Sequence, residues 1–142
     1  MNIAIGSDHA GFELKEKLIT YLKLKNNTVI DKGCYSAERA DYPDYGHAVA
    51  NAVLNKEAQV GVLMCGSGNG INITANKHTG IRAALCWNSE IATLARQHND
   101  ANILVLPARY MSVEEAHKCI DVFLTEKFEG GRHLDRVKKI DI

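Results

Sequence analysis

The sequence predicts an α/β fold: a single three-layer α/β/α domain over residues 1–142, built on a five-stranded, parallel, Rossmann-like sheet. Short apolar runs alternate along the chain with longer segments of helical periodicity, and no repeat or linker interrupts them. Buried parallel strands are typically continuous apolar runs, and right-handed crossovers favour helices on both faces of a doubly wound sheet. A chain of 142 residues is also long enough for one well-buried core.

Five short apolar runs are the expected strands. They cover residues 1–6, 28–30, 59–64, 81–86 and 103–106. The first run carries no basic region or cleavage site, so we expect a strand there and not a signal peptide. Pro107 stops the last run because proline cannot donate to the ladder of a central strand.

The segments between these runs are the expected helices. They cover residues 12–22, 48–54, 71–77, 89–98 and 112–125, where apolar residues recur at helical spacing or a capping residue precedes them. Ser89 and Ser112 are suited to N-cap positions. The stretch 32–43, which ends in a proline, is expected to be a loop. The basic tail, about residues 128–142, is expected to end in a helix that contributes to a ligand site or an interface.

Composition and charge exclude several classes of function. The chain is 46% hydrophobic, and its 17 basic and 17 acidic side chains cancel, so we expect no nucleic-acid partner and no membrane association. The four cysteines are Cys34, Cys65, Cys86 and Cys119. Their wide spacing matches no zinc motif. We recognise no signal peptide, which would have indicated an oxidising location and disulfides. We therefore expect free thiols in a reducing, cytoplasmic location and no metal.

A glycine-rich segment directly follows the third expected strand. Gly66, Gly68 and Gly70 alternate with other residues, including Ser67 and Asn69, at the junction with a helix. Glycines let the backbone approach a ligand closely, and unpaired N–H groups there bind a phosphate or a developing enolate oxygen. The spacing matches neither a dinucleotide fingerprint nor a P-loop. On spacing alone, a purely structural turn fits equally well.

Cys65 favours a functional reading of this segment. Thiolate character is promoted at a strand end that faces a helix N-terminus, whereas most cysteines are small buried hydrophobes. We assign that structural role to the other three. A reactive cysteine acts either as a nucleophile or as a base next to a carbonyl, and the base requires an oxyanion site for the enediolate. The residues alone leave both roles open.

Further candidates lie after other strands and in the tail. Asp8 and His9 follow the first strand, where they either contact a ligand or cap the next helix, and Arg109 follows the fifth strand. His98 ends a helix and is a candidate general acid or base, with a simple helix-end role as the alternative.

The tail contains a pair of arginines four residues apart. Arg132 and Arg136 would share one helix face and, with His133 nearby, form a candidate phosphate clamp. A solvated basic tail is the structural alternative.

Together these segments resemble the family of sugar-phosphate isomerases that contains the type B ribose-5-phosphate isomerases and the galactose-6-phosphate isomerase subunits. The resemblance covers essentially the whole chain. It rests on Gly6-Ser7-Asp8-His9-Ala10-Gly11-Phe12, Asp41-Tyr42-Pro43, Cys65-Gly66-Ser67-Gly68-Asn69-Gly70, Ala75-Asn76-Lys77, Gly80-Ile81-Arg82-Ala83, Arg96-Gln97-His98-Asn99-Asp100-Ala101-Asn102 and Glu129-Gly130-Gly131-Arg132-His133. Each motif alone is unspecific, whereas their order is highly specific.

The resemblance implies a cofactor-free and metal-free aldose–ketose isomerase of the pentose phosphate pathway that interconverts D-ribose 5-phosphate and D-ribulose 5-phosphate through a cis-enediolate. By position, Cys65 resembles the base at C2, His98 the group that opens the sugar ring, and Ser67 the group that moves a proton between O1 and O2. The implied substrate-binding residues are Asp8, His9, Gly66, Gly68, Asn69, Gly70, Asn99, Arg109, Arg132 and Arg136.

The resemblance also implies a homodimer or tetramer whose sites are completed across the interface, so that His98, Asn99 and Arg109 serve the partner's site. Some relatives lack the cysteine and carry a glutamate as base directly after the glycine segment. Ile71 stands there in this chain, which agrees with the cysteine branch. Two alternatives remain at this point: a 6-phosphohexose such as allose 6-phosphate or galactose 6-phosphate as substrate, and a non-catalytic phosphate- or nucleotide-binding module.

Overall fold

The computed structural model describes residues 1–142 and contains one parallel sheet of five strands. Its order is β2-β1-β3-β5-β4, so the chain adds strands on both sides of β1 and β3. The strands are β1 (Asn2–Ser7), β2 (Thr28–Asp31), β3 (Val60–Cys65), β4 (Ala83–Leu85) and β5 (Ile103–Pro107). All four pairings are parallel, which confirms the predicted sheet.

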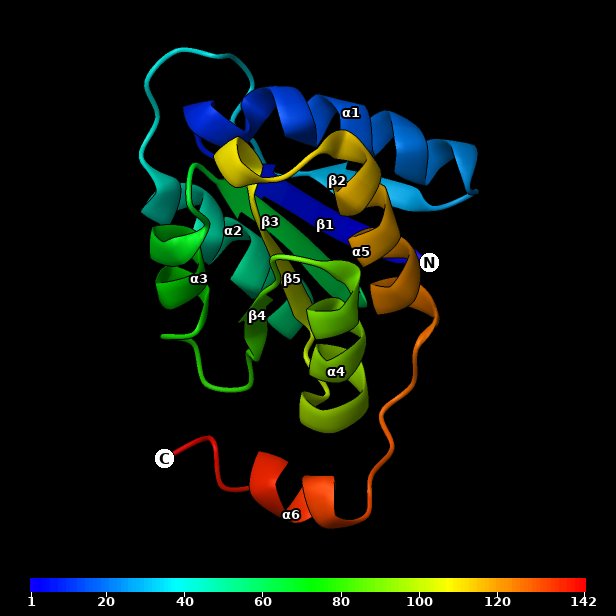
Figure 1. Ribbon diagram of the computed structural model, residues 1–142. Helices are drawn as coiled ribbons and strands as arrows, with labels where there is room; N and C mark the ends of the chain where they lie inside the picture. Colours follow the sequence, from blue (N-terminus) through cyan, green and yellow to red (C-terminus); the bar gives the residue numbers. More distant parts are fainter.

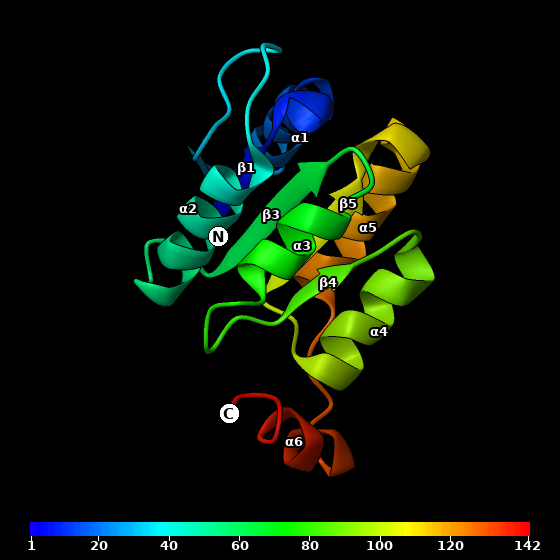
Figure 2. The same ribbon diagram turned by 90° about the vertical axis from the view of Figure 1, so that its left-hand side faces the viewer.

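Helices cover both faces of this sheet (Figure 1). They are α1 (Phe12–Leu24), α2 (Tyr42–Leu54), α3 (Asn69–Ala75), α4 (Ser89–Asn99), α5 (Val113–Thr125) and α6 (Arg132–Val137), with single 3₁₀ turns η1 (His9–Gly11) and η2 (Ala108–Tyr110). Figure 2 shows α2 and α3 in front of the sheet, with α1 and α5 behind it. None of the helices combines the length and the apolar composition needed to cross a bilayer.

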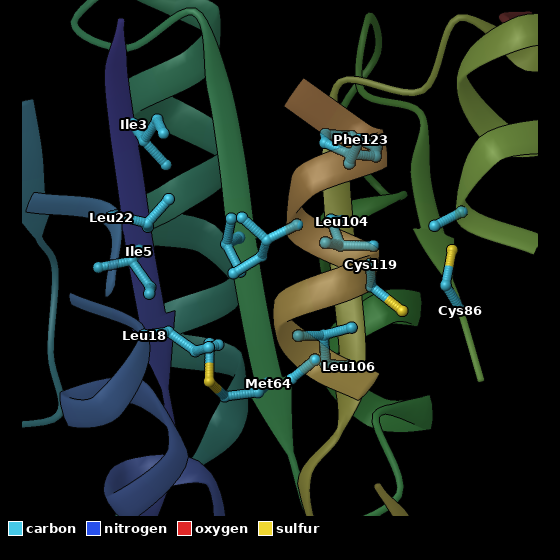
Figure 3. Packing of buried hydrophobic residues seen from close by; sticks show 14 of the residues in the cluster. Ile3, Ile5, Leu18, Leu22, Met64, Cys86, Leu104, Leu106, Cys119 and Phe123 are labelled. Atoms are coloured by element: carbon cyan, nitrogen blue, oxygen red, sulfur yellow. The ribbon is translucent and has the colours of Figure 1, made fainter. Parts of the chain in front are cut away.

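Side chains that alternate along the strands form two separate cores. Ile3 and Ile5 of β1 face the larger core, where α1, α4 and α5 pack (Figure 3), whereas Ala4 faces the smaller core under α2 and α3. In β3, Met64 faces the larger core and Cys65 the smaller one. This alternation is the period of two that a strand imposes, and it assigns each strand-end side chain to one face of the sheet.

The helix α2 begins earlier than predicted. The sequence indicated a loop up to Pro43 and a helix from residue 48, whereas α2 starts at Tyr42 with Pro43 in its first turn. Proline is tolerated in a first turn because the N–H that it lacks would have no intrahelical partner there. The prediction was wrong because it treated this proline as the end of a loop.

Two further boundaries differ from the predictions. Asn88, and not Ser89, caps α4, since its side-chain oxygen accepts a hydrogen bond from the Ile91 N–H at 2.9 Å. The strand β4 is shorter than predicted because it lies at the edge of the sheet and pairs with β5 alone. The cap predicted at Ser112 is confirmed, with its Oγ accepting from the Glu115 N–H at 3.1 Å.

The parallel topology gives the sheet two chemically different ends. At the carboxyl edge, where the strands end, lie η1, the segment 66–70 and η2. The helix α4 runs back from this edge, so its last turn lies at the amino edge, where α6 packs against it (Figure 2). Each predicted site residue therefore belongs to one of these two ends.

Candidate active site

Cys65 is the last residue of β3 and lies at the centre of the carboxyl edge. It pairs in register with Pro107 of β5, and its side chain is buried in the smaller core, together with Leu63 and Ile71. As the sequence indicated, the thiol lies where a parallel strand ends and a glycine-rich segment begins. Cys34, Cys86 and Cys119 are also buried and free, as expected.

The segment after Cys65 presents backbone N–H groups that have no partner within the chain. The N–H groups of Gly66, Ser67, Gly68 and Gly70 make no backbone hydrogen bond, although the Gly66 carbonyl accepts one from the Arg109 N–H at 3.0 Å. The Ser67 hydroxyl accepts from the Asn69 N–H at 3.2 Å. Such a cluster of free donors is suited to an oxyanion that develops next to Cys65.

Close packing around this segment explains two of its glycines. Gly68 has φ of +80°, a left-handed conformation that L side chains rarely adopt. Gly70 packs against the Tyr42 ring, where a Cβ atom would lie 2.5–2.8 Å from three ring carbons. The Tyr42 side chain of α2 thus holds the first turn of α3 in place, and this contact was not predicted from the sequence.

Arg109 adds positive charge to the same edge. A Cβ atom placed on Gly66 would lie 3.3 Å from Arg109 Nη1, so the guanidinium borders the segment that follows Cys65. The backbone hydrogen bond between these two residues holds η2 against the segment. Cationic groups and free N–H donors are the surroundings in which cysteines act as thiolates, and guanidinium groups bind phosphate through paired donors.

Asp8 and His9 lie at the same edge after β1. The buried Asp8 carboxylate accepts hydrogen bonds from the N–H groups of Ala10 and Gly11 at 2.9 and 3.1 Å, so Asp8 has the capping role considered from the sequence. His9 Nδ1 lies 3.1 Å from the Ala40 carbonyl oxygen and 3.2 Å from the Ala40 backbone nitrogen. These contacts hold the His9 ring through Nδ1 and leave Nε2 as the nitrogen available to a ligand. The contribution of Ala40 comes from a distant loop and has no signal in the sequence.

Four predicted site residues lie at the opposite edge. His98 and Asn99 end α4, and Arg132 and Arg136 lie on α6, which packs against α4 at the amino edge (Figure 2). Both arginines are exposed, as a ligand-binding pair requires, and both lie on one short helix, as predicted. Within one chain, the sheet separates these residues from Cys65.

His98 lies in a cluster of three side chains, which we call the histidine cluster: His98, Glu129 and His133. The two imidazole rings stack with centroids 4.2 Å apart and planes 10° from parallel. Glu129 Oε1 lies 3.6 Å from His98 Nε2 and 3.7 Å from His133 Nε2. The stacked His133 is largely buried, whereas Arg132 and Arg136 on the same helix are exposed.

Electrostatics and ring orientation define what the histidine cluster can do. Burial, followed by the nearby His98 and Arg132, lowers the pKa of His133 below its ordinary value. The three ligand atoms lie within 4.8 Å of one another. Because the rings are nearly parallel, a metal ion on the lone-pair axis of one imidazole would lie out of the plane of the other. The two imidazole rings are therefore poorly oriented to hold one metal ion together.

Comparison with known proteins identifies relatives over the whole chain. A family model described as Ribose/Galactose Isomerase matches residues 3–140. A protein of Escherichia coli named ribose-5-phosphate isomerase B is 47% identical over 138 residues, which cover 97% of this chain and 93% of the relative.

Solved structures of similar proteins superpose closely. A ribose 5-phosphate isomerase from Thermotoga maritima is 54% identical, with a TM-score of 0.97 and coverage of 99% of this chain and 97% of that one. A ribose-5-phosphate isomerase B from Mycoplasma genitalium with bound ribulose-5-phosphate is 44% identical, with a TM-score of 0.93 and coverage of 98% and 93%.

Proposed function

The chain belongs to the ribose/galactose isomerase family, and we propose that it is an aldose–ketose isomerase that interconverts D-ribose 5-phosphate and D-ribulose 5-phosphate. The observation that carries the proposal is the position of the Cys65 thiol directly before four free N–H groups, in a segment that the exposed Arg109 borders at Gly66. The relatives named above are ribose-5-phosphate isomerases, and one is bound to ribulose-5-phosphate. This favours the pentose over a 6-phosphohexose or a non-catalytic binding role.

In the proposed reaction, Cys65 is the base. Its thiolate removes the proton from C2 of the open-chain aldose, the electron pair forms the C1–C2 double bond, and O1 becomes an oxyanion. The four free N–H groups that follow Cys65 stabilise that oxyanion, and Ser67 relays the proton from O2 to O1. The Cys65 thiol then returns its proton to C1, which yields the ketose and regenerates the thiolate.

The proposed substrate contacts come from both edges of the sheet. At the carboxyl edge, the Asp8 and Asn69 side chains bind sugar hydroxyls, and His9 and Arg109 bind the phosphate. At the amino edge, Arg132 and Arg136 complete the phosphate site, and Asn99 binds the sugar. His98 donates a proton to the ring oxygen to open the furanose.

A second copy of the chain brings these two edges together. Because one chain holds Cys65 and His98 at opposite edges of its sheet, we propose a homodimer in which each site takes residues from both chains. Arg109 lies beside the Gly66 of its own chain, so in this proposal it serves the same site as its own Cys65. The segment 128–142 then contributes both to the phosphate site and to the interface.

Substitution of Cys65 tests the proposed base. We expect Cys65→Ala to reduce turnover of ribose 5-phosphate by ~10²–10⁴-fold, measured in a coupled assay without added metal. Cys34→Ala is the matched control, since Cys34 is equally buried and free but follows β2 instead of β3. Turnover of Cys65→Ala close to that of the wild type would show that another group is the base.

Two measurements separate this function from its alternatives. Relative kcat/KM values for ribose 5-phosphate and allose 6-phosphate compare pentose with hexose, and we expect the pentose to be preferred. Exchange of the C2 hydron with solvent deuterium, followed by NMR, detects the enediolate chemistry, whereas a binding module shows no exchange. We place the reaction in the pentose phosphate pathway and in the cytoplasm, where four free thiols remain reduced.

A further inference from the structure

The contact between Glu129 and His98 has no part in the chemistry described so far. We propose that Glu129 is a positioning residue for His98: its carboxylate faces Nε2 of the ring and leaves Nδ1 as the nitrogen that exchanges a proton with the sugar. This inference rests on the proposed function, in which His98 opens the furanose ring. Glu129 itself touches neither substrate nor reacting atoms in this proposal.

The distances support a choice of tautomer. Glu129 Oε1 lies 3.6 Å from His98 Nε2, an ion-pair distance, and the same oxygen lies 3.7 Å from His133 Nε2. A carboxylate next to one ring nitrogen favours the tautomer that carries its hydrogen there. The other nitrogen, Nδ1, then has the free lone pair when His98 is neutral, and it becomes the donor when His98 is protonated.

His133 fixes the plane of the His98 ring. The stack at 4.2 Å and 10° leaves His98 little freedom to tilt, and His133 is itself buried with a side chain only 11% exposed. Burial lowers the pKa of His133 below its ordinary value and so disfavours a positive charge on this ring beside Glu129. Stacking thus sets the plane of the His98 ring, and Glu129 sets which of its nitrogens carries the hydrogen when the ring is neutral.

Hydrogen bonds hold the Glu129 segment on the last turn of α4. The Glu129 N–H donates to the Gln97 carbonyl at 3.0 Å, and Gln97 Nε2 donates to Glu126 Oε2 at 2.8 Å. The Glu129 side chain is 51% exposed, and ion pairs at such exposure contribute little to stability. A mainly stabilising role is therefore a poor explanation for this contact.

The other charged groups near His98 leave Glu129 as its acidic partner. On α4, Arg96 is tied to Asp100 at 3.1 Å and to the Ala101 carbonyl. On α6, the positive charges of Arg132 and Arg136 lower the pKa of the neighbouring His133. Glu126 is held by Gln97. Glu129 is the acidic side chain within ion-pair distance of His98.

A first experiment reads the tautomer of His98 without substrate. We compare ¹⁵N-histidine NMR spectra of the wild type, Glu129→Ala and the control Glu126→Ala at a pH where His98 is neutral. We expect the hydrogen of His98 at Nε2 in the wild type and in E126A, and a mixture of tautomers in E129A. An unchanged tautomer in E129A overturns the proposal, as does an equal change in E126A, which would indicate loss of docking.

A second experiment separates ring opening from proton abstraction. Ribose 5-phosphate is mostly cyclic, whereas ribulose 5-phosphate is open-chain and exchanges its C1 hydron without ring opening. We expect E129A to lower kcat for ribose 5-phosphate ~10–100-fold while C1 exchange of ribulose 5-phosphate stays unchanged. An equal loss with both sugars overturns the proposal.

His98→Asn distinguishes failure of this inference from failure of the proposed function. If H98N loses turnover of ribose 5-phosphate and E129A does not, His98 acts without Glu129 and only the present inference falls. If H98N retains turnover, the ring-opening role of His98 in the proposed function is wrong, and the inference falls with it.

Discussion

At the scale of single residues, the four buried cysteines differ in what surrounds them. Burial raises the pKa of Cys86 to about 12, and the neighbouring Cys119 contributes to this shift. Burial likewise raises the pKa of Cys119 to about 12, with a contribution from Glu115. Figure 3 shows both among the hydrophobic side chains of the larger core. Cys65 is buried too, but it is followed by free N–H donors and bordered by Arg109. Cys65 therefore differs from Cys86 and Cys119 in the polar groups around it, and not in its burial.

Two histidines make the stability depend on pH. Burial is the main cause that lowers the pKa of both His133 and His78 below the ordinary 6.5, with His98 and His47 as further causes. The unfolded chain then binds more protons than the folded chain as the pH falls below about 6.5, so stability is highest above that pH and decreases towards pH 5. We expect His133→Gln to show a shallower decrease than the wild type.

Urea unfolding at a series of pH values between 8 and 5, at one protein concentration, measures this slope. His117→Gln is a control for the loss of an imidazole, because His117 stacks on Tyr21 far from the histidine cluster. A slope for His133→Gln equal to that of the wild type would contradict the assignment of a depressed pKa to His133.

At the scale of elements, the start of α3 depends on a contact with α2. A Cβ atom on Gly70 would lie 2.5–2.8 Å from the Tyr42 ring, so we expect Gly70→Ala to destabilise the protein by ~1–3 kcal/mol through overpacking. In a Tyr42→Ala background the ring is gone, and the same change should stabilise by up to about 1 kcal/mol, since alanine is the better helix former. Urea unfolding of the four proteins in this cycle measures the change of sign.

Destabilisation by Gly70→Ala in both backgrounds would show that its backbone conformation, and not the ring, requires glycine. Gly130→Ala provides a comparison in which no atom lies within 4 Å of the added Cβ and only the positive φ of +67° opposes the change. That variant should cost about 1 kcal/mol without dependence on Tyr42.

The elements themselves were largely predictable, whereas contacts between them were not. The strand before Cys65 and the segment after it are contiguous, so their apolar run and glycines indicated the edge on which they lie. The start of α2 was predicted six residues late because Pro43 suits a loop and a first helical turn equally well. The contacts of Ala40 with His9 and of Tyr42 with Gly70 join residues about 30 positions apart, and local patterns carry no information on them.

At the scale of the whole molecule, the arrangement of the sheet explains why the candidate site divides in two. A helix that follows a parallel strand must run back to the amino edge before the next strand begins, so the end of α4 cannot lie beside the end of β3. The family resemblance implied that His98 serves the site of a partner chain, but it gave no physical reason. The folded chain supplies one, because the end of α4 and the end of β3 lie at opposite edges of the sheet (Figure 2).

This separation predicts complementation between two inactive variants. Cys65→Ala and His98→Asn remove groups at opposite edges, so in the proposed homodimer a mixed pair contains one site with both groups intact and one site with neither. Coexpressed or co-refolded in equal amounts, the two variants should recover about a quarter of wild-type activity, because half of the dimers are mixed and each has one intact site. The measurement is turnover of ribose 5-phosphate, with each variant refolded alone as control. If each site instead used the His98 of its own chain, every site in the mixture would lack one group, and activity would stay at the level of the separate variants.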